Sequence, residues 1–198
     1  MSIRRPAWAT LLLALTACDP SAGPPVPPST PPIDVRFSPK GGCTEAVVDA
    51  LNEAKSTVLV QAYSFTSAPI ARALVDAHRR GVKVDVLLDK SQRTEKYSSA
   101  DFVAHSGIPT SIDDRHAIAH NKIMVIDDRT VLTGSFNFTR AGEEHNAENL
   151  LVIRDVALAE KYAANWRSHR QHSDPYAGRG VEPAAPLLKP VDAGEPEK

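Results

Sequence analysis

Apolar and polar positions follow two different periods along the chain, and segments of the two kinds alternate. Short runs rich in Val, Ile and Leu indicate buried strands at 56–63, 82–88, 110–112, 122–126, 130–136 and 149–153. Apolar residues at helical spacing indicate helices at 68–80, 99–105 and 156 to about 172. Alternating strands and helices that give way to consecutive strands predict an α/β fold, with a mixed β-sheet flanked by helices on both faces.

The two ends of the chain differ from this middle part. Residues 1–17 contain two arginines, an apolar run and then small residues, which is typical of a secretory signal peptide. Residues 18–33 are rich in proline and predict an extended linker. Residues 174–198 are rich in proline, glycine and acidic side chains and predict a disordered tail. A single domain is therefore expected at 34–173.

The end of the signal peptide, LTAC, resembles the bacterial lipobox, in which the cysteine is lipidated after cleavage. We therefore expect Cys18 to anchor an exported protein on the periplasmic side of a membrane; the alternative is a plain signal peptide with a chance cysteine. Asp19 resembles a signal for the inner membrane, but that rule varies between bacteria, so the choice of membrane stays open. Cys43 then has no partner for an internal disulfide, and its place near a helix start favours a half-buried structural residue over a reactive thiol or an intermolecular bridge.

Charge gives no general attraction to a polyanion. The formal net charge is -1, and residues 34–173 contain equal numbers of acidic and basic side chains. A local basic cluster, Lys90, Arg93 and Lys96, follows the strand at 82–88, where α/β sheets place binding groups. It would suit a nucleic-acid backbone, or it is a solvated loop whose charge is partly cancelled by neighbouring acidic residues. Since no aromatic run offers base stacking, we expect little sequence preference.

Four polar residues lie at the ends of two neighbouring strands. Side chains two apart on a strand share a face, so His120 pairs with Lys122 and Ser135 pairs with Asn137. If the strands form a hairpin through residues 127–130, both pairs meet at one end of the sheet. Lysine charge, asparagine and serine donors and a histidine nucleophile or proton carrier suit an anion with several oxygens. The alternative is a solvated histidine with ordinary turn chemistry at the serine and asparagine.

Two further residues near this group are expected to play smaller parts. Asp127 has the wrong parity to share the face of His120, and it stands where a turn begins, so spacing alone gives it a structural role. His116, four residues before His120, could line the site or serve as an internal acid. On a continuous strand, however, the two histidines would be roughly 13 Å apart, which is too far to flank one phosphorus.

These residues form a pattern that resembles the phospholipase D superfamily. HNKIMVID matches its HxKxxxxD motif, GSFNFT follows at the family's distance, and NAENLL comes next. The upstream stretch VQAYSFTSAPIARALVDAHRRGVKVDVLLD resembles small bacterial endonucleases that carry a single copy of the motif. The resemblance covers about residues 35–170. The family's functional residues then fall on His120, Lys122, Asp127, Ser135, Asn137 and Glu148.

The resemblance implies a phosphodiesterase reaction with a covalent intermediate. His120 would attack phosphorus and form a phosphohistidine, which water then resolves. Lys122 and Asn137 would hold the non-bridging oxygens, where charge develops. Glu148 would hydrogen-bond His120 and fix its tautomer, and Asp127 would have a supporting role. No cofactor is implied.

The resemblance also implies a homodimer. The family uses two HxKxxxxD motifs per active site, whereas this sequence contains one. The small members form a symmetric dimer with the site on the two-fold axis, so His120 would face its own copy. The interface is expected to bury apolar surface near Ser135 and Arg140. The reaction would need no metal, and the sequence shows no group of ligands at a recognised metal-binding spacing.

Three functions remain open on this evidence. The likeness to the small nucleases favours a non-specific endonuclease that acts on DNA or RNA. A lipid headgroup is also a phosphodiester, and a membrane anchor would bring it close, so a phospholipase D-type hydrolase or transferase is the second. A non-catalytic envelope binding lipoprotein is the third, and the intact motif argues against it.

Overall fold

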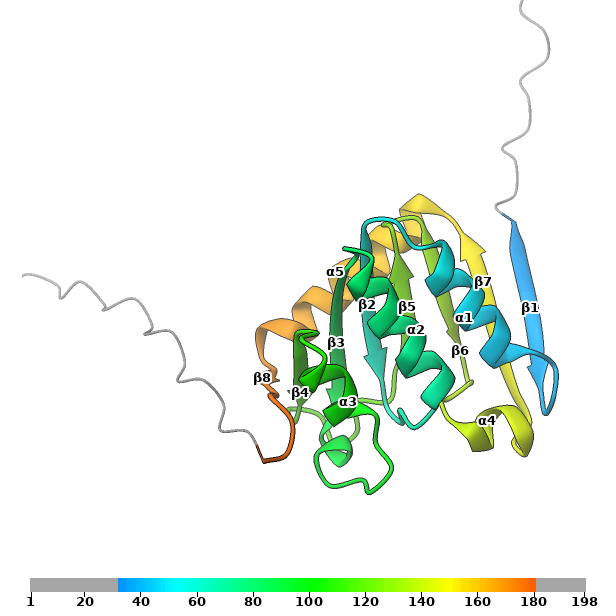
Figure 1. The fold of residues 1–198 in the computed structure, drawn as a ribbon. Helices are drawn as coiled ribbons and strands as arrows, with labels where there is room; N and C mark the ends of the chain where they lie inside the picture. Colours follow the sequence, from blue (N-terminus) through cyan, green and yellow to red (C-terminus); the bar gives the residue numbers. More distant parts are fainter. Residues whose placement is uncertain (1–31, 181–198) are drawn as a thin grey trace, which may run out of the picture. The chain divides into compact units, whose positions relative to one another are not determined.

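The computed structural model describes residues 32–180 (Figure 1). The signal peptide expected at 1–17, Cys18, which is expected to be lipidated, and most of the expected linker lie outside the described residues, as do residues 181–198 of the expected tail. Among the described helices, none has the length and apolar character needed to span a bilayer.

An eight-stranded sheet forms the centre of the described part, in the order β1-β7-β6-β5-β2-β3-β4-β8. The strands are β1 (Ile33–Ser38), β2 (Thr57–Ala62), β3 (Lys83–Asp89), β4 (Thr110–Asp113), β5 (Lys122–Ile126), β6 (Thr130–Gly134), β7 (Glu148–Arg154) and β8 (Asp174–Pro175). The neighbours β2, β3 and β4 run parallel, and the other pairs run antiparallel. The sheet is therefore mixed, as predicted.

Helices cover both faces of the sheet. They are α1 (Cys43–Glu53), α2 (Ala68–Arg79), α3 (Ala100–His105), the short α4 (Arg140–Glu144) and α5 (Val156–Gln171), with a 3-10 turn η1 (Lys90–Arg93). Figure 1 shows α1, α2 and α3 in front of the sheet and α5 behind it. The predicted α/β fold with helices on both faces is confirmed.

The apolar run in β5 reflects this double cover. All five residues of the strand are buried. Met124 and Ile126 pack in the cluster that contains α1 and α2, whereas Val125 packs against Ala159 and Ala163 of α5. A strand that is buried on both faces needs apolar residues at successive positions, so it shows no polar alternation.

One helix cap and one side-chain hydrogen bond connect helices to distant segments. The carboxylate of Glu143 in α4 accepts hydrogen bonds from the backbone N–H groups of Gly42 (3.0 Å) and Thr44 (2.7 Å) at the start of α1. The indole N–H of Trp166 in α5 donates to the carbonyl of Val60 in β2 (2.8 Å). A carboxylate at a helix N-terminus pairs N–H groups that the helix itself leaves free.

The structure changes the expected domain limits. Strand β1 was not predicted; it pairs with β7 along the edge of the sheet. The expected end at residue 173 is too early, because β8 pairs with β4 and Tyr176 donates to Asp101 (2.6 Å). A two-residue strand is too short to show a period, and the proline and glycine around it are typical of a loop, so the sequence did not predict β8.

Candidate active site

Except for Asp127, the residues of the family motifs lie at the edge of the sheet where β2, β3 and β4 end and β5 begins. Ala62, the last residue of β2, pairs with Lys122, the first residue of β5. The next backbone contact joins Tyr63 N–H to the carbonyl of Asn121 (3.0 Å). Binding groups in α/β proteins commonly lie beyond the carboxyl ends of parallel strands, as they do here.

His120, Lys122 and Tyr63 form one contact group. The exposed imidazole of His120 lies against the ring of Tyr63, with ring centroids 4.6 Å apart. The Lys122 ammonium lies 5.2 Å from the centroid of the same ring and donates to the backbone carbonyl of His120 (2.6 Å). Tyr63 thus contacts both motif residues and helps to set the position of their side chains relative to each other. The sequence analysis missed Tyr63, although its place directly after a buried strand is a usable signal.

Lys122 is unusually buried for a lysine, with 7% of its surface exposed. Burial lowers the pKa of Lys122 below its ordinary value, and the negative charge of Glu148 acts in the opposite direction. A buried ammonium gains most when an anion arrives, because low local dielectric strengthens the attraction. Lys122 is therefore suited to bind a phosphate oxygen.

Ser135 and Asn137 follow β6, which ends at Gly134 and not at 136 as expected. Phe136 and Phe138 are fully buried and meet edge to face, with centroids 6.3 Å apart. Their burial turns the alternate side chains, Ser135 and Asn137, away from the core. Gly134 has φ 150°, and a Cβ there would collide with the carbonyl oxygen of Asn149, which explains the glycine.

The structure places Asn137 close to the His120 group. Tyr63, Thr66, Tyr97, Asn137 and Asn146 are among the residues that line an open hollow of about 420 Å³. The side-chain carbonyl of Asn137 is buried and makes no hydrogen bond within residues 32–180. Tyr63 therefore borders both His120 and the hollow that contains Asn137.

Ser135 and Glu148 make contacts that differ from the expected roles. The Ser135 hydroxyl accepts hydrogen bonds from the backbone N–H (3.0 Å) and side-chain amide (3.4 Å) of Asn149, so it orders the start of β7. Glu148 accepts from the side-chain amide of Asn146 (3.2 Å). The expected Glu148–His120 hydrogen bond is not present among the described residues.

Asp127 lies at the other end of β5, roughly 20 Å of strand from His120. Its carboxylate accepts from the backbone N–H groups of Lys55, Ser56 and Thr57 and from the Ser56 hydroxyl. Burial raises the pKa of Asp127, but these hydrogen bonds outweigh it and hold the pKa below its ordinary value. Asp127 anchors the β5–β6 turn, with φ 53°, to the start of β2, which agrees with the role that its parity suggested.

The three basic residues of the expected substrate loop do not act as one cluster. Lys90 donates to the carbonyl of His116 (3.0 Å), and Arg93 approaches Asp174 (3.5 Å). Lys96 lies over the ring of Tyr97, 5.4 Å from its centroid. Lys96 alone belongs to the loop that borders the hollow, so it is the one best placed to meet a substrate.

Cys43 lies at a helix start, as the sequence suggested, but it is more deeply buried than the half-buried position that was expected. It is the first residue of α1 and is fully buried. Burial, together with the charge of Glu143, raises the pKa of Cys43 to about 11. A thiol held protonated in the core is a poor nucleophile, so this residue is structural.

A second group of polar residues was missed by the sequence analysis, which found no metal-ligand cluster. Asp113, His116, His169 and His172 bring one ligand atom each to within 4.8 Å of the others. The ligands come from the end of β4 and the end of α5, which are far apart in the sequence. The i, i+3 spacing within each pair, D-x-x-H and H-x-x-H, was the available signal.

Comparisons with known proteins agree with the geometry. A family model described as "Cardiolipin synthase, PLD-like domain" matches residues 47–170. A phospholipase D of Rickettsia bellii is 42% identical over 134 residues, covering 68% of this chain and 67% of that protein. A mitochondrial cardiolipin hydrolase of Xenopus laevis is 31% identical over 113 residues, covering 57% of this chain and 54% of that protein.

A solved structure is similar over nearly its whole length. Nuc, a phospholipase D family member from Salmonella typhimurium, matches with a TM-score of 0.72 and 38% identity, over 74% of this chain and 98% of that chain. The family model spans more than half of the present sequence, and the motif residues His120 and Lys122 are in contact at the sheet edge. The chain therefore belongs to the phospholipase D superfamily and is an enzyme of its phosphodiesterase type.

Proposed function

We propose that the enzyme is a non-specific endonuclease that cleaves DNA or RNA through a phosphohistidine at His120, without a metal ion in the reaction, in a homodimeric active site. The observation that carries this proposal is the exposed imidazole of His120 beside the buried ammonium of Lys122, both held by Tyr63. An accessible nucleophile next to a fixed positive charge is what attack on an anionic phosphodiester needs.

The first step forms one bond and breaks one. A ring nitrogen of His120 attacks phosphorus, the P–N bond forms, and the P–O bond to the leaving group breaks. The leaving oxygen takes a proton from a second imidazole. In the second step that imidazole removes a proton from water, the water oxygen attacks phosphorus, and the P–N bond breaks. Lys122 and the amide of Asn137 offset the charge that develops on the non-bridging oxygens.

The second imidazole is best supplied by a second copy of the chain. His116 is the nearest alternative in sequence, but its Nδ1 lies 3.1 Å from Asp113, and its ring packs against His169 and His172. His116 is therefore committed to another cluster. A two-fold axis through the site would instead bring the partner's His120 opposite this one.

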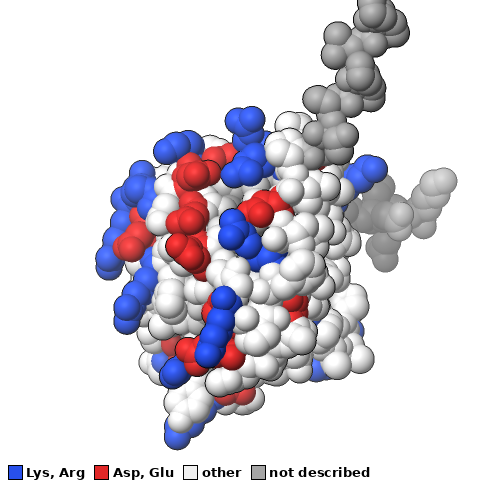
Figure 2. Space-filling model, turned by 90° about the vertical axis from the view of Figure 1, so that its right-hand side faces the viewer, with Lys and Arg blue, Asp and Glu red and all other residues white. Residues whose placement is uncertain are grey.

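Exposed apolar surface beside the site supports such an interface. Ile33, Val35 and Phe37 project from the edge strand β1, and Phe37 is 67% exposed. Phe37 pairs in register with Asn149, and the N–H of Asn149 donates a hydrogen bond to the Ser135 hydroxyl. The strip formed by the exposed side chains of β1 therefore ends next to the site. Figure 2 shows uncharged surface next to interspersed charges on the side of the molecule where β1 lies. A second copy would cover this strip.

A mixing experiment tests the shared site. Wild-type chains are allowed to exchange with excess His120→Ala chains. If each site needs both histidines, activity falls with the square of the wild-type fraction, because mixed dimers are inactive. A linear fall would mean that each chain works alone. Phe37→Asp, which charges the proposed interface, should shift the protein toward monomer in ultracentrifugation and reduce turnover.

A phospholipid substrate is the second candidate, and one observation favours it. Two exposed apolar side chains, Tyr97 and Ile118, lie near the hollow and the loop before His120. Apolar groups at the rim of a site can enter a lipid surface. The names of the relatives, phospholipase D and cardiolipin hydrolase, describe lipid phosphodiesters.

Substrate assays separate the two candidates. The purified protein is incubated in EDTA with supercoiled plasmid, with RNA and with phosphatidylcholine or cardiolipin vesicles. We expect plasmid nicking by the wild type and none by His120→Ala. Choline or phosphatidate release without any nicking would replace the nuclease proposal with the lipid one. A strict requirement for added Mg²⁺ would contradict both.

We also propose that the enzyme is an exported, membrane-anchored lipoprotein. The support is the LTAC sequence that ends at Cys18. Cys18→Ser should release the protein from membranes or leave an uncleaved precursor. Recovery of the wild-type protein in the soluble fraction, with no acyl group detected by mass spectrometry, would refute the proposed lipid anchor.

A further inference from the structure

Three histidines surround one fully buried carboxylate at the end of strand β4. The Asp113 carboxylate lies 2.8 Å from His169 Nδ1, 3.1 Å from His116 Nδ1 and 3.4 Å from His172 Nε2. The side chain of Asp113 has no exposed surface, and its oxygens face the three rings and the N–H of Arg115. The ring centroids lie 4.8 to 5.5 Å apart.

The ligand types and spacing match a tetrahedral metal site. Zinc takes imidazole nitrogen and carboxylate oxygen at about 2.0–2.1 Å, which places ligand atoms about 3.3 Å apart. The three nitrogen–carboxylate distances, 2.8 to 3.4 Å, already lie at this spacing. The widest separation among the four ligand atoms is 4.8 Å, so the rings would move inward on binding. His116 and His172 are 45% and 29% exposed and have room to turn.

One atom of the group lacks a role without a metal. His172 Nε2 is buried, and its 3.4 Å contact with Asp113 does not have hydrogen-bond geometry. A buried ring nitrogen without a partner is costly, and such an atom calls for an explanation. The Asp113 carboxylate pairs here with His116 and His169 only, whereas a metal ion would engage all three rings.

We propose that Asp113, His116, His169 and His172 bind one divalent transition-metal ion, with zinc as the ion that this ligand set suits best. Four protein ligands fill a tetrahedral shell, so the site is structural and leaves no position for a substrate. It is separate from the His120 chemistry, which uses Lys122 and Asn137 in place of a metal.

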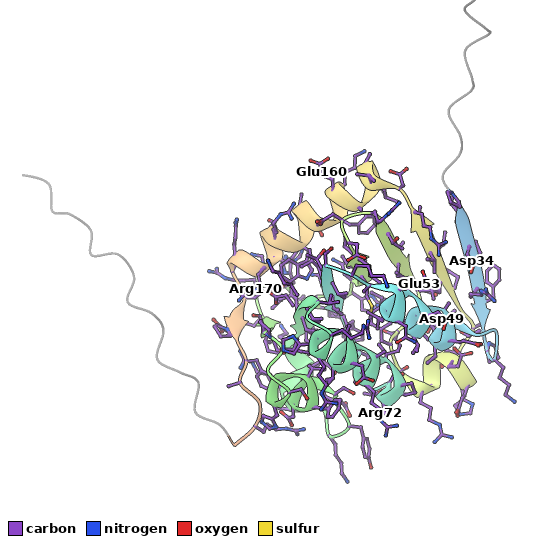
Figure 3. The ribbon with its side chains drawn as sticks, turned by 45° about the horizontal axis from the view of Figure 1, so that its top comes forward. Asp34, Asp49, Glu53, Arg72, Glu160 and Arg170 are labelled. Atoms are coloured by element: carbon purple, nitrogen blue, oxygen red, sulfur yellow. The ribbon has the colours of Figure 1, made fainter. Side chains whose placement is uncertain are left out.

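The metal would fix the segment that carries the nucleophile. Residues 114–121 connect β4 to β5, and His120 lies at their end. The segment is already held by Asp89, which accepts from Ala119 N–H (2.7 Å), and by the Lys90 contact at His116. The metal would add a link from His116 to the last turn of α5, next to Arg170, whose position Figure 3 marks. Arg170 itself is directed to Asp85, 3.9 Å away, so its charge is offset.

Metal binding is measured directly on the purified full chain. After chelator treatment and dialysis, Zn²⁺ is titrated in competition with a chromophoric chelator, and Co²⁺ is added to a parallel sample. We expect one Zn²⁺ per chain, the intense visible absorption of tetrahedral Co²⁺, and a rise in melting temperature with Zn²⁺. These readouts do not involve the substrate, so they stand or fall independently of the proposed nuclease activity.

His172→Gln is the diagnostic variant, because its Nε2 makes no hydrogen bond that the metal-free fold would lose. We expect its metal-free melting temperature to match the wild type and its zinc affinity to fall at least about tenfold. His116→Gln, the change at the most exposed ligand, is the second variant; its zinc affinity should fall by a similar factor, and the loss of its hydrogen bond to Asp113 should also lower its metal-free melting temperature. His105→Gln, a change at an exposed histidine outside the group, should keep full affinity.

Two outcomes would overturn the proposal. One is a wild-type chain that takes up no stoichiometric metal, which would leave a hydrogen-bonded Asp–His cluster. The other is zinc affinity that both ligand variants retain in full, which would place any bound ion elsewhere on the chain.

Discussion

The two ends of strand β5 carry the two halves of one sequence motif and do different work. At the start of the strand, His120 is exposed and Lys122 is buried against Tyr63. At the end, Asp127 accepts hydrogen bonds from three successive backbone N–H groups. The proposed reaction needs an accessible nucleophile and a charge that water does not screen, whereas anchoring a turn needs an acceptor that pairs several backbone N–H groups at once. A contiguous motif therefore need not mean a contiguous site.

Loss of the nucleophile is expected to have the largest effect. His120→Ala should lower turnover by about three orders of magnitude or more, because the covalent step has no substitute nucleophile. The exposed ring makes few contacts that support the fold, so the melting temperature should stay close to the wild type. Steady-state rates test the loss of turnover, and a thermal melt tests whether the fold is retained. Residual activity within about tenfold of the wild type would contradict the assignment.

Loss of the buried charge comes next. Lys122→Met keeps the length and apolar contacts of the side chain but removes the charge, and turnover should fall by about two orders of magnitude. Because burial lowers the pKa of Lys122, the wild type should lose activity at a less alkaline pH than an ordinary lysine would give. The pH profiles of wild type and variant test this: the alkaline limb should vanish in Lys122→Met. An unchanged limb would assign it to another group.

Loss of the Asp127 carboxylate should lower the stability of the fold more than the rate of turnover. Asp127→Ala leaves three backbone N–H groups of the β2 entry without their acceptor, which should lower the free energy of unfolding by about 2 kcal/mol. Turnover per folded molecule should change by less than about tenfold. Denaturant unfolding and rates at low temperature separate the two effects. A large loss of turnover in a fully folded variant would place Asp127 in the chemistry after all.

The same aspartate predicts a pH window for stability. Its pKa in the folded state is lowered from 3.8, so the unfolded state binds the proton more readily. The stabilisation is therefore fully present above the unfolded pKa and is lost as pH falls through the folded pKa. Wild type and Asp127→Asn should differ in stability near neutral pH and converge in acid. A difference that grows in acid would have the wrong sign.

Local pattern was enough to predict most of the fold. The limits of β5 were predicted to the residue, and the hairpin to β6 followed from the turn residues that begin with Asp127. The sequence analysis missed β1, although residues 33–38 alternate strictly between apolar and polar side chains, because the strand directly follows the proline-rich segment. The alternation over these six residues was the available signal, although the apolar side chains that carry it are exposed at the sheet edge and not buried in the core.

Contacts between distant segments could not be predicted in the same way. His169 and Asp113 are separated by 56 positions in the sequence. They meet because the end of α5 lies beside the end of β4 in the folded chain. Ser135 and Asn137 alternate with the fully buried Phe136 and Phe138, as the sequence predicted. The predicted strand was too long, however, because β6 ends at Gly134, before all four residues. The expected bond between Glu148 and His120 also depended on side-chain placement, which spacing does not fix.

The most direct test of the central claim is to trap the covalent intermediate. The enzyme is mixed with a short oligonucleotide, quenched in alkali during turnover and digested for mass spectrometry. A phosphohistidine mechanism predicts a phosphoryl-nucleotide adduct on the peptide that contains His120, formed and lost at rates consistent with turnover and absent from His120→Ala. Turnover without any adduct, or an adduct on a different residue, would contradict it.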